Sequence, residues 1–244
     1  MSKAFSKNHN LHLIDGSGFI FRAYHALPPL TRSDGTPVGA VAGYCNMILR
    51  MIEDNHGVNA ATHLAVIFDH KSKTFRSEIF PKYKANRPPP PEDLVPQFEL
   101  IRKATEAFNL PCVELKGYEA DDVIATYASI AKKIGANVTI VSSDKDLMQL
   151  VGDGIQMFDA MKSLMINKDS VYDKFGVWPE KVVDVQALAG DSVDNVPGAP
   201  GIGIKTAALL IREFGSLENL LHNADKIIQP KRRQSLIEND KQIR

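Results

Sequence analysis

Tyr118-Glu119-Ala120-Asp121-Asp122 and, about twenty residues later, Ser143-Asp144-Lys145-Asp146 place five carboxylates in two short stretches. Between them, Asn137-Val138-Thr139-Ile140-Val141 is typical of a strand, and the amphipathic segment before it is typical of a helix that ends at Gly135. The apolar residues on one face of this predicted helix are Val123, Tyr127, Ile130, Ala131 and Ile134. The acids therefore stand at a helix start and at a strand exit, which is the ligand-binding edge of an open α/β sheet.

A cluster of carboxylates needs a source of neutralisation. Two carboxylates about 4 Å apart repel by roughly 4 kcal/mol at an effective dielectric constant near 20. Mg²⁺ and Mn²⁺ prefer oxygen ligands, so a cluster of acids without His or Cys suits these ions. A second interpretation stays open at this point, because Glu119 and Asp122 are also favoured at a helix N-terminus for their charge alone.

Two other predicted strands end in an aspartate. Leu11-His12-Leu13-Ile14 leads to Asp15, and the uninterrupted apolar run Leu64-Ala65-Val66-Ile67-Phe68 leads to Asp69. Such a run is typical of a strand buried on both faces of a parallel sheet. One aspartate of this kind is usually a cap or turn residue, but two of them weaken that explanation. Strands alternate with helices through residue 141, which predicts a mostly parallel, three-layer α/β domain.

The stretch 71–91 interrupts this alternation. It carries six basic residues against the single acid Glu78, three aromatic residues, and the run Arg87-Pro88-Pro89-Pro90-Pro91. Four prolines hold the backbone extended and exclude a helix or a central strand. Because the stretch begins two residues after Asp69, we predict a basic, aromatic-bearing excursion above the acids, suited to phosphates and unpaired bases. The alternative is a solvated loop with a rigid spacer.

The stretch 190–207 is rich in glycine and carries Asp191 and Asp194 at a spacing that allows one helical face. Its glycines allow tight turns and the close approach of a ligand. Lys205 and Thr206 begin a predicted helix, whose first amide groups with a lysine beside them would bind a phosphate. The spacing differs from that of a nucleotide-binding P-loop.

Composition sets broad limits. The 244 residues are 44% hydrophobic and 24% charged with a net charge of zero, which is ordinary for a globular protein. No apolar run has the length of a membrane span, and the first ten residues lack the apolar core of a signal peptide. Cys45 and Cys112 have no metal-type spacing and are expected to be core thiols. We therefore expect a monomeric cytoplasmic protein without a membrane partner. The absence of a stop signal near Arg244 predicts a fragment of a longer protein.

Taken together, these motifs closely resemble the 5′-nuclease domain of bacterial DNA polymerase I, in the flap endonuclease family. The resemblance spans residues 11 to about 215, and no acid of the family pattern is missing. The matching stretches are Leu13–Gly16, Phe21–Ala26, Val66–Asp69, Tyr83–Pro88, Glu119–Asp122, Asp144–Asp146 and Gly190–Ala207.

The resemblance implies two divalent ions, Mg²⁺ or Mn²⁺, held by acids. Positions at or near the first ion are Asp15, Asp69, Glu119, Asp121 and Asp144. Positions of the second are Asp146, Asp191 and Asp194, and Asp122 also matches the pattern. The glycine-rich stretch matches the family's helix–three-turn–helix, which grips duplex DNA and whose loop carbonyls hold a K⁺ ion. The DNA-binding residues expected from this match are Gly198, Gly201, Gly203, Lys205 and Thr206.

The implied fold is α/β, with a mostly parallel central sheet flanked by helices. It is PIN-like, of the flap endonuclease type, and is followed by a helical DNA-binding subdomain. We expect the nuclease domain at 1–183, with its basic excursion at about 71–105, and the helical subdomain at 184–244. Residues assigned to the chemistry are Lys84 on the scissile phosphate, Arg87 and Arg22 in support, and Tyr83 stacking on the terminal base.

The predicted function is hydrolysis of DNA at 5′ ends, flaps or nicks in replication and repair, alone or with a polymerase. Bacterial nucleoid DNA is the expected location. Three alternatives remain: a structure-selective DNA-binding module whose acids are inactive, a PIN-like ribonuclease, and a phosphatase with an aspartate nucleophile in Asp144-Lys145-Asp146. The glycine-rich stretch disfavours the ribonuclease, and the number of acids disfavours the phosphatase.

Overall fold

The computed structural model describes residues 6–57 and 59–244, and the chain divides into two compact units. The first unit combines the described residues up to Phe75 with Pro89–Leu147 and Asp153–Met165. The second combines Arg76–Pro88, Met148–Gly152 and Ile166–Arg244. Most of the basic stretch thus belongs to the unit formed mainly by the C-terminal residues. The domain boundary at residue 183 stays a prediction.

The first unit is built on a six-stranded sheet in the order β3-β2-β1-β4-β5-β6. Its strands are β1 Asn10–Asp15, β2 His63–Ile67, β3 Cys112–Val113, β4 Asn137–Val141, β5 Ile155–Asp159 and β6 Leu164–Ile166. Parallel pairing joins β1 to β2 and β4, β2 to β3, and β4 to β5. Only four residues connect β5 to β6, too few for a parallel crossover, so β6 forms an antiparallel edge. The predicted mostly parallel sheet is confirmed.

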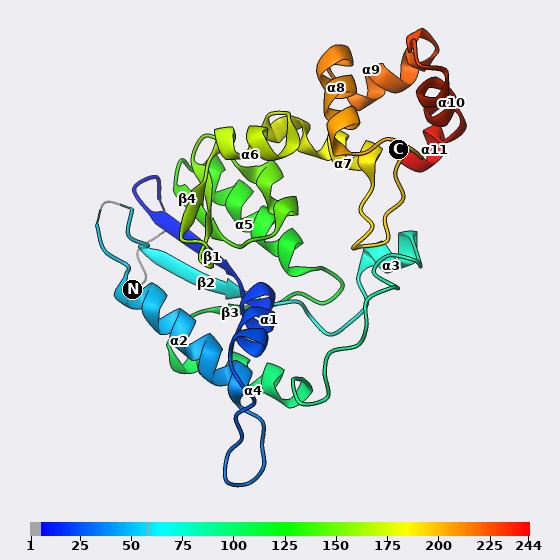
Figure 1. Cartoon of the computed structure of the whole chain (residues 1–244). Coiled ribbons are helices and arrows are strands. Elements are labelled where there is room, and N and C mark those ends of the chain that lie inside the picture. The colour runs from blue at the N-terminus through cyan, green and yellow to red at the C-terminus, as the bar shows by residue number, and fades with distance from the viewer. Residues whose placement is uncertain (1–5, 58) are drawn as a thin grey trace. The chain divides into compact units, whose positions relative to one another are not determined.

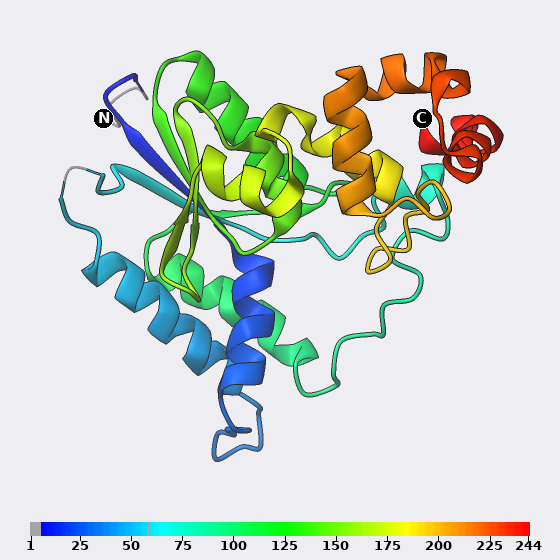
Figure 2. The same ribbon diagram turned by 45° about the horizontal axis from the view of Figure 1, so that its top comes forward.

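Helices cover both faces of this sheet. They are α1 Gly16–Ala26, α2 Gly39–Glu53, α4 Val95–Ala107 and α5 Ala120–Lys133. Figure 1 shows α1 and α2 on the opposite side of the sheet from α5, and in Figure 2 α4 lies on the α1 and α2 side. The core beneath α1, α2 and α4 includes Phe19, Ile20, Ile48, Phe68 and Ile101, which are at most 4% exposed.

The packed face of α5 differs from the predicted face. Val123 and Ala131 are buried as expected, but Tyr127, Ile130 and Ile134 are 42%, 53% and 44% exposed. The buried side instead includes small residues, among them Ala120, Ala128 and Ala131. This side also includes Ile124, which is fully buried, so the packed stripe of α5 is turned about the helix axis away from Tyr127 and Ile130.

The second unit is helical. Its longer helices are α6 Lys168–Phe175, α7 Val182–Ala189, α8 Ile204–Phe214, α9 Leu217–His222 and α10 Pro230–Glu238. Its short elements are most of α3 Phe75–Ile79, the end of the 3₁₀ helix Lys145–Leu150, the 3₁₀ turns Pro179–Lys181 and Ala224–Lys226, and α11 Asp240–Ile243. Val182, Val185 and Leu188 of α7 are wholly buried, as is Ala207 of α8. The predicted C-terminal helical fold is confirmed.

Gly190 and Gly198 close the loop between α7 and α8. Gly190 has φ +69°, and a Cβ added to Gly198 would lie 2.3 Å from both the Ala189 carbonyl carbon and the Gly190 nitrogen. Between these glycines, Asp191 and Val196 exchange two backbone hydrogen bonds, of 2.8 and 2.7 Å. The loop is therefore a closed ring of backbone contacts. In the part of the chain that the structure describes, no helix is both long and apolar enough to cross a membrane.

A buried polar pair links α2 to α4. The Tyr44 hydroxyl lies 2.6 Å from Thr105 Oγ1, both residues are fully buried, and Thr105 donates to the Ile101 carbonyl at 2.9 Å. Burial raises the pKa of Tyr44, so this phenol stays protonated. Because the Thr105 hydroxyl donates its proton to the Ile101 carbonyl, the Tyr44 hydroxyl is the donor in its hydrogen bond with Thr105.

Thr105→Val should destabilise the protein by about 1–3 kcal/mol, because it leaves the buried Tyr44 hydroxyl without a partner. Tyr44→Phe should cost less, since Thr105 keeps its bond to Ile101. The double variant should be more stable than Thr105→Val alone, as measured by urea unfolding. Equal losses for the two single variants, adding in the double, would contradict this account.

Candidate functional site

Three neighbouring strands of the first unit deliver acids to one edge of the sheet. Asp15 is the last residue of β1, Asp69 lies two residues beyond β2, and Asp144 lies three beyond β4. Because β2, β1 and β4 are parallel neighbours, their carboxyl ends lie together. The structure therefore brings these three predicted acids to the same edge.

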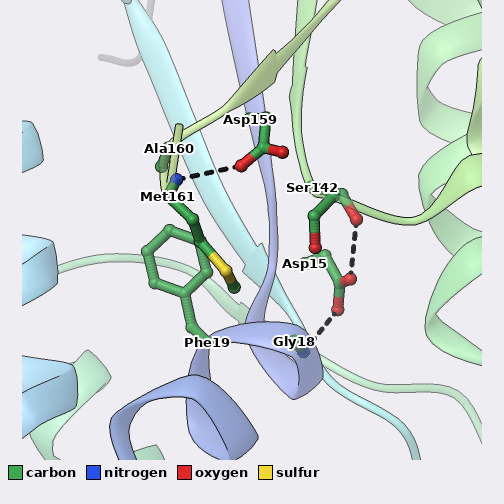
Figure 3. Close-up of a pocket in the computed structure, with 8 residues that line it drawn as sticks. Asp15, Gly18, Phe19, Ser142, Asp159, Ala160 and Met161 are labelled. Atoms are coloured by element: carbon green, nitrogen blue, oxygen red, sulfur yellow. Dashed lines mark hydrogen bonds between the residues drawn. The ribbon is translucent and has the colours of Figure 1, made fainter. Parts of the chain in front are cut away.

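Asp15 is the most buried of these acids, at 9% exposure. Its Oδ1 accepts a 3.0 Å hydrogen bond from the Gly18 amide, which caps α1, and its Oδ2 accepts a 2.8 Å bond from the Ser142 hydroxyl (Figure 3). Burial raises the pKa of Asp15, the two hydrogen bonds oppose that rise, and repulsion from Asp69 and Asp144 adds to it. A bound divalent cation would offset both the burial of this carboxylate and its repulsion by the two neighbouring acids.

Asp69 and the acids at the start of α5 are joined by hydrogen bonds. The Ala120 amide donates to Asp69 Oδ1 at 2.8 Å. Glu119 and Asp122 form a reciprocal capping box, in which the Glu119 amide donates to Asp122 Oδ2 at 3.0 Å. Asp121 lies in the first turn of the same helix. The helix-capping interpretation of Glu119 and Asp122 thus describes real contacts, and it does not exclude a second role.

Asp144 and Asp146 lie in the turn that follows β4. The Asp144 amide donates to Ser142 Oγ at 3.0 Å, and the Asp146 amide donates to Asp144 Oδ1 at 2.8 Å. Asp146 also pairs with the neighbouring Lys145 at 3.2 Å. Ser142 therefore touches two of the predicted acids, through its proton on Asp15 and its oxygen at Asp144.

The acids are oxygen donors gathered at one edge, but they are not arranged as a finished metal centre. Within residues 6–57 and 59–244, no group of three or more His, Cys, Asp or Glu side chains is placed to hold a metal ion. Asp15, Asp69, Glu119, Asp122, Asp144 and Asp146 instead accept hydrogen bonds from an amide, a hydroxyl or a lysine. The donor set nevertheless fits a hard divalent ion, because it is all carboxylate and includes a buried charge.

A small cavity adjoins Asp15 (Figure 3). It is lined by Asp15, Ser142, Asp159 and Met161, among others, and its volume of about 10 Å³ suits one water molecule. Asp159 is 3% exposed and accepts from the amides of Met161 and Lys162 at 3.0 and 3.2 Å. These bonds shape the turn between β5 and β6, so we assign Asp159 a structural role.

In the second unit, the predicted chemical residues gather around Asp194. Arg87 forms an ion pair with Asp194 Oδ1, Lys84 Nζ lies 3.8 Å from Oδ2, and the Tyr83 hydroxyl donates to Oδ2 at 3.5 Å. Lys84 also stacks on the Tyr83 ring, 4.9 Å from its centroid. The Asp194 side chain is 12% exposed. Asp191, in the same loop, accepts from the Val193 amide at 2.8 Å.

The remaining predicted residues are distributed between the two units. Arg22 is exposed on α1 of the first unit. Gly201 has φ +78°, Gly203 caps α8, and Lys205 and Thr206 lie in the first turn of that helix. Lys205 is exposed at the positive end of an eleven-residue helix, an arrangement suited to a phosphate. Gly198 is packed against the α7 end, as described above.

Sequence reasoning missed Ser142 and Asn195. Ser142 bridges Asp15 and Asp144, and its place at the exit of β4 beside the acids was the available signal. Asn195 donates to the Lys82 carbonyl at 2.7 Å, which links two segments that are 113 residues apart. Nothing local in the sequence indicates such a partner for Asn195.

Ser142→Ala should destabilise the protein by about 1–3 kcal/mol, because Asp15 Oδ2 loses its donor while remaining buried. Ser142→Thr keeps the hydroxyl and should lose less. The comparison is made by chemical denaturation in EDTA, so that metal does not contribute. Equal stability of the alanine variant and the native protein would remove Ser142 as the link between these acids.

Two protein-family models match consecutive parts of this chain. Residues 10–176 match the family model of the 5′-3′ exonuclease N-terminal, resolvase-like domain, and residues 177–244 match that of the 5′-3′ exonuclease C-terminal SAM fold. DNA polymerase I of Rhizobium leguminosarum is 59% identical over 237 residues, which are 96% of this chain and 23% of that protein. The 5′-3′ exonuclease of Aquifex aeolicus is 42% identical over 216 residues, 88% of this chain and 73% of that protein. The chain thus spans about a quarter of the polymerase.

Solved structures share the fold. T5 5′-exonuclease with bound divalent metal ions (zinc) has a TM-score of 0.80 and 25% identity, covering 96% of this chain and 86% of that one. The catalytic core of Rad2 in complex with DNA substrate has a TM-score of 0.59 at 16% identity, covering 96% and 73%, and shows likeness of fold alone. The two family models cover residues 10–244 between them, so the chain belongs to the 5′-3′ exonuclease family.

Proposed function

We propose that this chain is a structure-specific 5′ nuclease that hydrolyses DNA phosphodiester bonds at 5′ ends, flaps or nicks. The observation that carries the proposal is the buried carboxylate of Asp15, which shares the carboxyl edge of parallel strands with Asp69 and Asp144. A chain that only bound DNA would gain nothing from a costly concentration of negative charge beside its polyanionic ligand. Family membership supports the same reading.

Mg²⁺ or Mn²⁺ are the proposed cofactors, and T5 5′-exonuclease is a relative whose structure contains divalent ions. The residues proposed to hold two ions are Asp15, Asp69, Glu119, Asp121, Asp122, Asp144, Asp146, Asp191 and Asp194. Divalent ions there would supply a nucleophilic water at neutral pH and neutralise charge developing on the phosphate. The chain's own part is to hold the carboxylates in place, which Ser142, the Gly18 amide and the Ala120 amide do for Asp15 and Asp69.

Lys84 and Arg87 are the proposed phosphate-binding cations. Both contact Asp194 in the structure, so each is held in a defined position beside an anion. A phosphate oxygen would replace the Asp194 carboxylate as their partner, and Arg87 would bind it through its planar fork. Arg22 supports the same phosphate, and Tyr83 stacks on the unpaired terminal base.

The start of α8 is the proposed duplex grip. Gly198, Gly201, Gly203, Lys205 and Thr206 would contact the sugar-phosphate backbone, with a K⁺ ion on the loop carbonyls. Backbone contacts carry no sequence information, so selectivity should follow DNA structure rather than base order. The protein would work as a monomer on bacterial DNA in the cytoplasm, alone or joined to a polymerase as in the Rhizobium relative.

A 5′-flap cleavage assay with and without EDTA tests the proposal directly. Cleavage that requires a divalent ion supports it, whereas binding without cleavage at any metal concentration would favour an inactive DNA-binding module. A parallel RNA flap separates the remaining alternative, because faster cleavage of RNA than of DNA would indicate a PIN-like ribonuclease.

Asp144→Ala should abolish cleavage while largely retaining DNA affinity, since the variant keeps the lysines and arginines that bind phosphates. Single-turnover cleavage and fluorescence anisotropy measure the two quantities. Glu99→Gln on α4, where the Glu99 side chain is 75% exposed, is the matched control and should cleave normally. An unchanged cleavage rate for Asp144→Ala would remove this residue from the metal set.

Lys205→Ala should weaken duplex binding and make it less sensitive to salt. Loss of one phosphate contact reduces the magnitude of the negative slope of log affinity against log salt by about 0.9. Lys132→Ala on α5 removes an exposed lysine of the first unit and should keep the native slope. If both variants retained that slope, the duplex contact would have to lie elsewhere.

A further inference from the structure

Two asparagine side chains fasten the 82–87 segment to the loop that carries Asp194. Asn195 donates from Nδ2 to the Lys82 carbonyl at 2.7 Å, and Asn86 donates from Nδ2 to the Ser192 carbonyl at 3.1 Å. Between these two anchors, the Lys84 amide donates to the Asp194 carbonyl at 2.9 Å. All of these residues belong to the second unit. Lys84 is therefore bracketed, two residues away on either side, by a hydrogen bond to the same loop.

The backbone on both sides of this contact adopts the left-handed conformation. Lys84 has φ +54° and Asn195 has φ +58°. The left-handed region is unfavourable for lysine, so Lys84 needs neighbouring contacts to stay in it, whereas asparagine tolerates that region well. The loop itself is closed by the paired backbone bonds between Asp191 and Val196, which makes it a firm support for Asn195. The asparagine amides are thus placed to hold Lys84 in a conformation that it would not adopt alone.

The fastening has a charged part and a neutral part. The charged part is the pairing of Arg87 and Lys84 with Asp194. Under the proposed function these ion pairs with Asp194 must break, because Lys84 and Arg87 bind the phosphate instead. The neutral part consists of the amide-to-carbonyl bonds of Asn195 and Asn86, which do not depend on the charge of Asp194. The neutral bonds can therefore persist through the exchange.

We propose that Asn195, assisted by Asn86, is a positioning residue that keeps Lys84 and Arg87 beside the loop once Asp194 no longer pairs with them. This proposal rests on the proposed role of Lys84 at the phosphate. Without the asparagine bonds, only the Lys84 amide would hold the 82–87 segment to the loop once the ion pairs dissolve, and Lys84 would reach the phosphate only part of the time. The loss should appear in the rate of the chemical step rather than in DNA affinity.

Asn195→Gly is the informative change, because glycine accepts the positive φ and the side-chain amide is lost. Single-turnover cleavage of a 5′ flap should slow by about tenfold, equal to 1.36 kcal/mol of barrier, with DNA affinity changed much less. Asn86→Ala removes the second anchor and should act in the same direction. Asn223→Ala, which removes an amide bond to Asn219 elsewhere in the second unit, is the control and should cleave at the native rate.

A double variant separates this role from general loosening of the fold. If Asn195 acts through Lys84, Asn195→Gly should cause no further slowing in a Lys84→Ala background. Slowing by the same factor in both backgrounds, or native rates for both Asn195→Gly and Asn86→Ala, would overturn the inference. Native rates for Lys84→Ala itself would instead overturn the proposed function of that lysine, so the two failures are distinguishable.

Discussion

The burial of one carboxylate among others is the constraint on which the first unit depends. Asp15 ends the central strand of the parallel group, caps α1, and accepts the Ser142 hydroxyl, so its position is fixed from three directions. Its pKa is raised because burial and the neighbouring charges of Asp69 and Asp144 outweigh the two hydrogen bonds. Burying this carboxylate among other acids destabilises the fold, and a bound divalent cation would offset that loss. The edge of the sheet is thus prepared for a ligand of positive charge.

The second unit carries the opposite arrangement. There, a nearly buried Asp194 is surrounded by the cations of the 82–87 segment, and amide bonds hold that segment in place. One unit gathers carboxylates at a sheet edge around a buried aspartate, and the other holds cations against a carboxylate. A nucleic-acid phosphate and divalent ions would satisfy both, which is the physical sense of acids and bases segregated in a chain of zero net charge.

The sequence predicted those features whose signal is local. The apolar runs before Asp15, Asp69 and Asp144 identified parallel strands, because period and length suffice for a buried strand. The resemblance to flap endonucleases was confirmed by the family models. The predicted packed face of α5 was partly wrong, since Ile124 and Ala128 are buried where Tyr127 and Ile130 were expected. The partners of Ser142 at Asp15 and of Asn195 at Lys82 were missed because they lie 127 and 113 residues away, and pairings of that range leave no pattern in neighbouring residues.

The contact between Gly190 and Gly198 has a mechanical consequence. With no room for even a methyl group, the backbone segment leaving α7 and the backbone segment approaching α8 touch directly. Neither can slide without displacing the other, so the acidic loop and the start of α8 share one fixed crossing point. Strain applied where α8 meets a ligand would be transmitted to the carboxylates of Asp191 and Asp194 through main chain alone, with no side chain to absorb it.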